Sequence, residues 1–397
     1  MSSKFRPLQG IRVVEMTHMI MGPSCGQILA YLGADVIKVE PPTGDKTRHL
    51  TGMGRSFFPS FNRGKRSITL NIKSVDGSKA LERLLETADV FVENFRDQSL
   101  AKMGFAISDL RERHPRLIIA SCKGFLHGPY QDRTAMDEVV QMMTGIAYMT
   151  GPKGRPLRIG SSANDIMGGL FGALAILGAL LEKQQSGQGR ALRIGLFENC
   201  LMLVMQHMVQ FDLDGHEPSP MPEREFSWPI YDTFNTRDEH QIFIGAVTEG
   251  HWKNLCINLG LERLLSDPRL QTKMNKIEAR DWTLPIFSEA IAKYAFSDLI
   301  GRFEASGIPF SPINRPTDMY QDPHVMRPGG LHHSHLPDGQ EFRVPGLPIE
   351  VDGEIPRPTS LDVADIGDHT EVILKEIGLS SSEIRAASGN DNAKKSP

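Results

Sequence analysis

The chain is 397 residues long, which is enough for two or three domains with a large hydrophobic core. Its composition, 40% hydrophobic and 23% charged, is typical of a soluble globular protein, and its formal net charge of −4 gives no overall attraction for nucleic acid or an anionic membrane. We therefore expect no nucleic-acid partner.

Other broad features point to a reduced, cytoplasmic protein. The first residues lack the apolar core of a signal peptide, and the uncharged stretch 166–181 is shorter than the roughly 20 residues that a membrane span needs, so we expect no membrane partner. The cysteines are far apart in the sequence and have no metal-ligand spacing with the histidines, so we expect no metal. The four cysteines are Cys25, Cys122, Cys200 and Cys256.

The first half of the chain alternates between strand-like and helical segments. Strands are predicted at residues 11–17, 34–40, 67–72, 89–94, 117–122 and 190–196. Helices are predicted at residues 25–32, 76–86, 100–103, 108–113, 136–147, 166–183 and 198–210. This alternation predicts an α/β fold with a doubly wound parallel sheet, whose ligands bind beyond the carboxyl ends of the strands.

The second half of the chain predicts a smaller α+β unit and a returning segment. Residues 228–247 alternate like strands, residues 249–259 and 284–306 have helical periodicity, and a hairpin is expected within 322–349, before a last helix at 368–378. We divide the chain into a large α/β domain at 1–210, a linker at 211–227, a small α+β domain at 228–315, a C-terminal segment at 316–385 and a disordered tail at 386–397.

Asn164 and Asp165 directly precede the apolar segment 166–181, which mixes large and small residues all round and predicts a buried helix. At the N-cap position a carboxylate faces free backbone N–H groups and the positive end of the helix dipole. Asp165 could simply cap the helix. Alternatively, it could be a nucleophile aimed at a substrate carbonyl, with N–H donors nearby for the oxyanion. Spacing alone leaves both readings open.

A series of short motifs runs in one order along nearly the whole chain. The motifs lie at 8–17, 22–23, 32–42, 44–45, 62–67, 70–73, 88–95, 103–104, 307–309, 322–323 and 367–370. Together they resemble the class III CoA-transferases, the family of formyl-CoA transferase and carnitine CoA-transferase, and the related α-methylacyl-CoA racemases. The resemblance implies a Rossmann-like large domain, a small domain, a C-terminal segment that returns to the large domain, and an interlocked homodimer.

The resemblance also implies a catalytic role for Asp165, because residues 163–169 match the family's nucleophile motif. In the implied reaction Asp165 attacks an acyl-CoA thioester and passes through a mixed anhydride and an aspartyl-CoA thioester, which an acceptor carboxylate opens. The implied donor is succinyl-CoA or another small acyl-CoA, and the implied acceptor is a carboxylic or dicarboxylic acid. For the acid's distal carboxylate, Arg48, Arg158 and His18 are candidates, as is the stretch around Trp228 and Tyr231.

The family's contacts to coenzyme A carry over onto loops of the large domain. These residues are Ile20, Met21, Pro41, Leu70, Asn71, Ile72, Lys73, Asn94, Phe95, Arg96, Lys102, Thr134, Met136 and Asp137. Among them, Lys73, Arg96 and Lys102 could pair with the phosphates.

Some positions depart from the family pattern and bear on which reaction is catalysed. Formyl-CoA transferase has Gln, Arg and Arg where this chain has Ile20, Pro41 and Lys102, and its flexible Trp matches Leu50, which argues against the formyl-CoA and oxalate pair. The racemases need a His that matches Met136 here, so a racemase is the weaker alternative. A CoA-binding protein without chemistry, in which Asp165 only caps the helix, is a third.

Overall fold

The computed structural model describes residues 5–224 and 226–389, which form two compact units. The first unit comprises the described residues of Met1–Pro222 and Pro323–Pro397, and the second comprises those of Glu223–Asp322.

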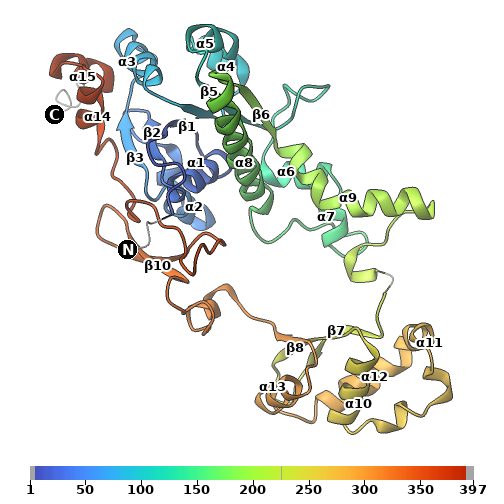
Figure 1. Cartoon of the computed structure of the whole chain (residues 1–397). Helices are drawn as coiled ribbons and strands as arrows, with labels where there is room; N and C mark the ends of the chain where they lie inside the picture. Colours follow the sequence, from blue (N-terminus) through green and yellow to red (C-terminus); the bar gives the residue numbers. More distant parts are fainter. Residues whose placement is uncertain (1–4, 225, 390–397) are drawn as a thin grey trace. The chain divides into compact units, whose positions relative to one another are not determined.

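The first unit is built on a six-stranded parallel sheet (Figure 1) with the order β3-β2-β1-β4-β5-β6. Its strands are β1 Arg12–Met16, β2 Asp35–Glu40, β3 Arg66–Thr69, β4 Val90–Glu93, β5 Ile118–Lys123 and β6 Ala191–Gly195. In the register, Val13 of β1 lies between Val36 of β2 and Val90 of β4. The predicted parallel sheet is therefore confirmed. The strand order reverses between β1 and β4, and in such sheets a ligand crevice opens at this point.

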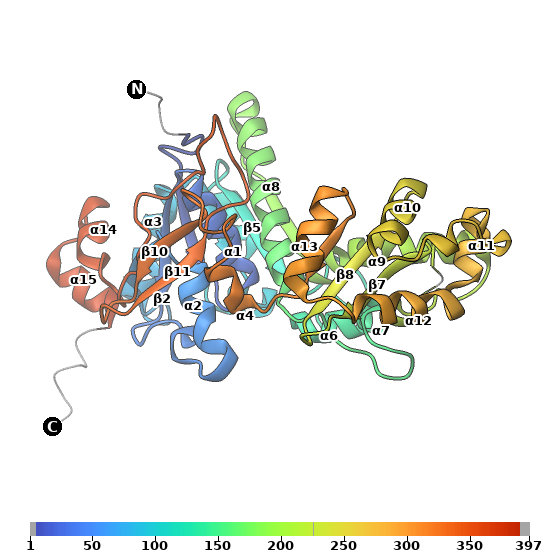
Figure 2. The same cartoon turned by 90° about the horizontal axis from the view of Figure 1, so that it is seen from below.

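Helices cover both faces of this sheet (Figure 2). The helices before the second unit are α1 Met21–Tyr31, α2 Phe57–Phe61, α3 Val75–Glu86, α4 Asp97–Lys102, α5 Ile107–Arg113, α6 Asp137–Met143, α7 Ile146–Thr150, α8 Ala163–Ser186 and α9 Leu196–Asp214. Because side chains alternate along a strand, Val13 packs into the core beneath α1 and α8, while Val14 packs into the core beneath α3.

The chain returns to the first unit after the second. This part contains the antiparallel hairpin β10 Leu331–His335 and β11 Glu341–Pro345, followed by α14 Thr370–Glu376 and α15 Ser381–Ser388. The β10–β11 hairpin confirms the hairpin predicted within 322–349, and α14 confirms the last helix predicted at 368–378. The returning segment is bound to the sheet: the Thr69 N–H donates to Thr370 Oγ1 at 3.0 Å, and Arg12 pairs with Glu376 at 3.0 Å.

The second unit has its own antiparallel sheet and core. Its elements are β7 Ile230–Asn235, β8 Gln241–Ala246, β9 Phe310–Pro312, α10 Glu249–Asn258, α11 Lys273–Glu278, α12 Arg280–Ile291 and α13 Phe296–Ala305, with strand order β7-β8-β9. Trp252, Phe287 and Phe303 are buried in its core. The single helix predicted at 284–306 is wrong in detail, since α12 and α13 are separate.

Short 3-10 helices connect several of these elements. They are η1 Lys46–His49, η2 Gly52–Ser56, η3 Met221–Glu223, η4 Glu262–Leu264, η5 Pro268–Leu270 and η6 Pro316–Tyr320.

Helix α8 differs from the prediction at its start and in its burial. It begins at Ala163, with Ser162 as the N-cap residue, so Asp165 lies inside the first turn and the predicted N-cap position is wrong. The helix is not buried all round either, because Leu170, Leu174 and Leu181 are more than half exposed. With 24 residues, α8 is the one helix in the described ranges whose length and composition would allow a membrane span, although the core helix of a soluble protein passes the same test.

Two further predictions near helix ends are corrected. The helix predicted at 136–147 is divided into α6 and α7, because Gly145 between them has a φ of +88° that a continuing helix cannot adopt. The tail predicted to be disordered from 386 is helical up to Ser388, because Ser380 and Glu383 form a capping box and Ile384 and Ala387 are buried. Residues 390–397 lie outside the described ranges.

Candidate active site

The first turn of α8 is fixed by two buried asparagines. Asn164 is fully buried and donates to the Leu196 carbonyl at 3.2 Å, while the Asn199 side chain donates to the Asn164 carbonyl at 2.7 Å and to its Oδ1 at 2.5 Å. These bonds tie the start of α8 to the start of α9. The neighbouring Asp165 is only half-buried, so the carboxylate sits on a rigid backbone at the edge of the core.

Glycines bring the start of α8 directly against the start of α1. A Cβ atom on Gly169 would lie 1.9 Å from Ser24 Oγ and 2.8 Å from the Met21 carbonyl oxygen, and one on Gly168 would lie 2.8 Å from Met21 Cε. Only glycine allows this approach. Because α1 follows β1 directly, Asp165 is brought to the carboxyl edge of the sheet.

A second carboxylate supports Asp165. Asp137, at the start of α6, is 8% exposed, and its Oδ2 accepts the backbone N–H of Asp165 at 3.0 Å. Its other oxygen accepts the side-chain amide of Gln141, whose own carbonyl oxygen accepts the Ile159 N–H at 2.9 Å. Asp137 is one of the predicted coenzyme A contacts, and the structure joins it to the predicted nucleophile.

This environment makes Asp165 an unusual carboxylate. Burial and, to a lesser extent, the negative charge of Asp137 together raise the pKa of Asp165 to about 7, against the opposing positive charge of Arg158. Arg158 is held nearby, where it donates to the carbonyls of Ile159 and Ser161 at 3.1 and 3.0 Å. A carboxylate with a pKa near 7 is more basic than an ordinary aspartate yet still substantially ionised at neutral pH, which suits a nucleophile.

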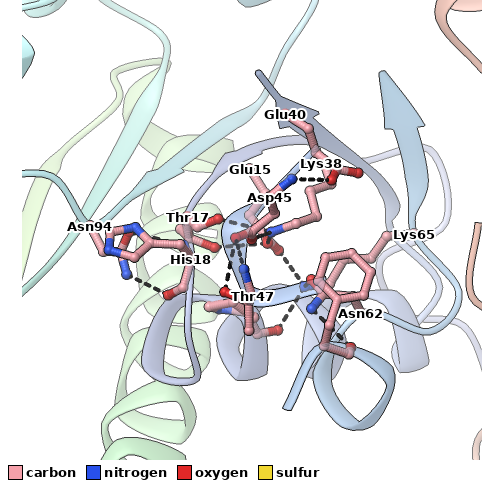
Figure 3. Close-up of polar contacts among 12 residues, drawn as sticks. Glu15, Thr17, His18, Lys38, Glu40, Asp45, Thr47, Asn62, Lys65 and Asn94 are labelled. Atoms are coloured by element: carbon pink, nitrogen blue, oxygen red, sulfur yellow. Dashed lines mark hydrogen bonds and ion pairs between the residues drawn. The ribbon is translucent and has the colours of Figure 1, made fainter. Parts of the chain in front are cut away.

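The loops that follow β1 and β4, where the strand order reverses, are joined by Asn94. Its Oδ1 accepts the His18 backbone N–H at 3.1 Å and its Nδ2 donates to the His18 carbonyl at 2.8 Å (Figure 3). The loop that carries Asn94 is itself anchored, because Glu93 accepts the Phe95 N–H at 2.8 Å and pairs with buried Lys123 at 2.7 Å.

Most of the predicted coenzyme A contacts lie in loops at this same edge of the sheet. Pro41 follows β2, residues 70–73 follow β3, and residues 94–96 follow β4. Lys73, Arg96 and Lys102 are exposed, and Arg96 donates to Thr134 Oγ1 at 2.6 Å. The side chains of Ile20, Met21 and Leu70 are buried, so these residues can offer a ligand only their main chain, whereas Met136 is 62% exposed. Asn71, Ile72, Asn94 and Phe95 are half-buried.

The expectation that Arg48 faces an acid's carboxylate is wrong. Its Nε and Nη2 each donate to a different oxygen of Glu40 at 2.7 Å, and Glu40 also accepts the Ser67 hydroxyl at 2.6 Å and the Asp45 N–H at 2.8 Å. A bidentate pair of this kind satisfies both partners internally. Trp228 and Tyr231, which were also candidates, contact each other in the second unit with ring centroids 4.9 Å apart.

Sequence reasoning missed a buried ionic cluster beside the turn that follows β1 (Figure 3). Glu15 and Lys38, at 0% and 2% exposure, lie 3.4 Å apart, Lys65 lies 2.7 Å from Glu15, and Asp45 lies 3.2 Å from Lys38. The available signal was a charged residue next to apolar residues within each of two strands, Glu15 after Val14 and Lys38 between Ile37 and Val39. In the described ranges, no group of three or more His, Cys, Asp or Glu side chains is arranged to hold a metal ion.

Comparison with known proteins identifies the family. Residues 8–370 match the model of CoA-transferase family III. The chain is 31% identical to the succinate–glutarate CoA-transferase of Agrobacterium fabrum, over 95% of this chain and 97% of that protein, and 30% identical to the human succinyl-CoA:glutarate CoA-transferase, over 94% and 87%. The crystal structure of a CAIB/BAIF family protein from Brucella suis superposes with a TM-score of 0.83 at 30% identity, covering 94% of this chain and all of that one. This chain therefore belongs to CoA-transferase family III and is a CoA-transferase.

Proposed function

We propose that this enzyme moves coenzyme A from succinyl-CoA, or another small acyl-CoA, to a carboxylic or dicarboxylic acid through covalent intermediates on Asp165. The observation that supports this most strongly is the half-buried Asp165 carboxylate, whose pKa is raised to about 7 beside the crevice of the sheet. The names of the relatives support the substrate class, because they include transferases of succinate, glutarate and mesaconate.

The proposed chemistry begins with attack of an Asp165 carboxylate oxygen on the thioester carbonyl carbon. The carbon–sulfur bond breaks, which leaves a mixed anhydride on Asp165 and the free thiolate of coenzyme A. The thiolate then attacks the Asp165 carbonyl carbon and releases the donor acid, which gives an aspartyl-CoA thioester. Each step exchanges one acyl bond for another, so no net proton is consumed.

The second half of the reaction reverses these steps with the acceptor acid. Its carboxylate attacks the aspartyl thioester and again forms a mixed anhydride and a thiolate. The thiolate attacks the acceptor's acyl carbon, which forms the new acyl-CoA and restores the Asp165 carboxylate. The positive end of the α8 dipole favours the negative charge that develops at each attack.

We further propose how the substrate and a second subunit bind. Lys73 and Arg96, which are exposed in the loops after β3 and β4, and Lys102, which is exposed at the end of α4, bind the phosphates of coenzyme A. The family resemblance implies an interlocked homodimer, and the exposed apolar side chains along α8 and α9 supply a surface for the second subunit. We propose that the enzyme is cytoplasmic, because its cysteines have no disulfide or metal-ligand pattern. Sedimentation of the purified chain tests the dimer.

A mass-spectrometric exchange assay tests the reaction. The wild type and Asp165→Ala are incubated with succinyl-CoA and a panel of mono- and dicarboxylic acids, and new acyl-CoA species are measured. We expect them with the wild type only. If no acid accepts coenzyme A while α-deuterium from solvent enters a branched acyl-CoA, the enzyme is a racemase and the proposal fails.

A further inference from the structure

The turn between β1 and α1, residues 17–20, has a strained main chain at the carboxyl edge of the sheet. Met19 adopts a φ of +65°, and it is one of three non-glycine residues with positive φ in the described ranges. Such a conformation is unfavourable for a residue with a Cβ atom and persists only where the surroundings impose it.

Buried polar groups hold this turn from several sides (Figure 3). Lys38 Nζ donates to the Thr17 carbonyl at 2.8 Å, and Thr47 Oγ1 accepts the Met19 N–H at 3.1 Å. The Thr47 hydroxyl in turn donates to Asp45 Oδ1 at 2.8 Å. With the two bonds from Asn94 to His18, the main chain of every residue from 17 to 19 is fixed.

The cluster that supplies these bonds is expensive to bury. Glu15, Lys38 and Lys65 are each at most 4% exposed, and removing a charge from water is unfavourable until pairing offsets the lost hydration. Apolar side chains would fill the same space at no such cost. A costly ionic cluster and a strained residue therefore meet at one turn, which points to a role of that turn in function.

The turn also lies beside the proposed nucleophile. Met21, directly after the turn, contacts Gly168, which is one helical turn beyond Asp165. On the proposed function, a small acid held by Asp165 therefore lies near this turn.

The side chain that the turn presents there is His18. It is exposed, and its ring lies against Phe95 with centroids 5.9 Å apart. Desolvation beside the sheet lowers the pKa of His18, although Asp45 opposes this effect, so the imidazole is neutral at pH 7 and can donate one hydrogen bond and accept another.

We infer that His18 is a specificity-determining residue, which hydrogen-bonds the distal polar group of a short dicarboxylic acid bound at Asp165. This inference rests on the proposed function. A carboxylate or hydroxyl at the far end of the acid satisfies the imidazole, whereas the methyl end of a monocarboxylic acid of equal length leaves it unpaired.

Succinate and butyrate provide the test, because both have four carbons and differ only at the distal end. The ratio of kcat/KM for the two acceptors is measured with one acyl-CoA donor. We expect His18→Phe to lower the succinate-to-butyrate ratio by about tenfold or more, and His18→Gln, which keeps a neutral donor and acceptor, to retain most of it. His324→Phe, an exposed histidine elsewhere in the first unit, is the matched control.

The outcomes separate the two proposals. If the wild type transfers coenzyme A but His18→Phe leaves the ratio within about twofold, the inference is wrong while the proposed function stands. A changed KM for the acyl-CoA donor with an unchanged ratio also overturns it, because His18 would then contact coenzyme A. If the wild type transfers coenzyme A to no acid, the proposed function itself fails.

A second pair of variants tests whether the turn positions His18. Thr47→Val removes the acceptor of the Met19 N–H and keeps the ionic side chains, whereas Thr47→Ser keeps the hydroxyl. We expect Thr47→Val to lower the succinate-to-butyrate ratio of kcat/KM and Thr47→Ser to keep it close to the wild-type value. A general loss of stability would instead lower kcat/KM for both acids equally, which would contradict a positioning role.

Discussion

Replacing Asp165 with Asn should stabilise the protein while abolishing transfer, and the gain should depend on pH. Burial and the charge of Asp137 raise the pKa of Asp165 from 3.8 to about 7, so the folded state disfavours the ionised form. The unfolded chain loses this proton near pH 4 and the folded chain only near pH 7. Stability is therefore lost as the pH rises from about 4 to 7, and the loss is complete above pH 7.

The size of the effect follows from this shift. At about 1.36 kcal/mol per pKa unit, the ionised carboxylate costs the fold up to about 4 kcal/mol at pH 8 and roughly 1.5 kcal/mol at pH 5. An uncharged Asn of the same shape avoids this cost. The advantage of Asp165→Asn over the wild type should thus grow by about 2.5 kcal/mol between the two pH values.

Thermal and urea unfolding at pH 5 and pH 8 measure this directly. The matched control is Asp76→Asn, which changes an exposed aspartate in the first turn of α3 and should slightly destabilise that helix, since a carboxylate there favours the dipole. If Asp165→Asn raises the free energy of unfolding equally at both pH values, or lowers it at pH 8, then burial and the charge of Asp137 do not raise the pKa of Asp165 as argued.

Two further predictions concern the surroundings of the nucleophile. Asp137→Asn removes a negative charge beside Asp165, so the acid limb of the pH–rate profile should move to lower pH; a limb that stays in place would show that Asp137 acts only through its hydrogen bonds. In α8, Gly169→Ala would place a Cβ 1.9 Å from Ser24 Oγ and should destabilise the protein by roughly 1–3 kcal/mol, as measured by urea unfolding. Gly178→Ala meets nothing within 4 Å and should stabilise the helix by about 0.5–1 kcal/mol, so equal effects of the two changes would contradict the close packing of α8 on α1.

The general architecture could be predicted from the sequence because it depends on local patterns. The alternation of strand-like and helical segments correctly indicated the parallel sheet, and the Gly residue at 339 marked the hairpin of β10 and β11. Boundaries were less predictable. The sequence suggests that Asn164 caps the helix, because polar residues usually precede an apolar helix. In the structure, Asn164 is instead fully buried and hydrogen-bonded to Leu196 and Asn199 of α9.

The site was harder to predict because its parts are distant in the sequence. Asp137 supports a backbone group 28 positions later, and Lys38 pairs with Glu15 across 23 positions, contacts that no local pattern encodes. Arg48 was assigned to a substrate because a lone arginine offers no sign of its partner. Only the fold shows that Arg48 forms a bidentate ion pair with Glu40.

The returning C-terminal segment has a consequence for how the chain folds during synthesis. The N–H of Thr69 in β3 bonds to Thr370, 301 positions later, and the N–H of Asn71 bonds to the Ala387 carbonyl. The edge of the sheet and the apolar face of α3 thus remain uncovered until nearly the whole polypeptide has left the ribosome, while the second unit, whose contacts are local, can complete its own core earlier. Closing loops this long is slow, so the first unit must spend the longest time as a partly folded, aggregation-prone intermediate.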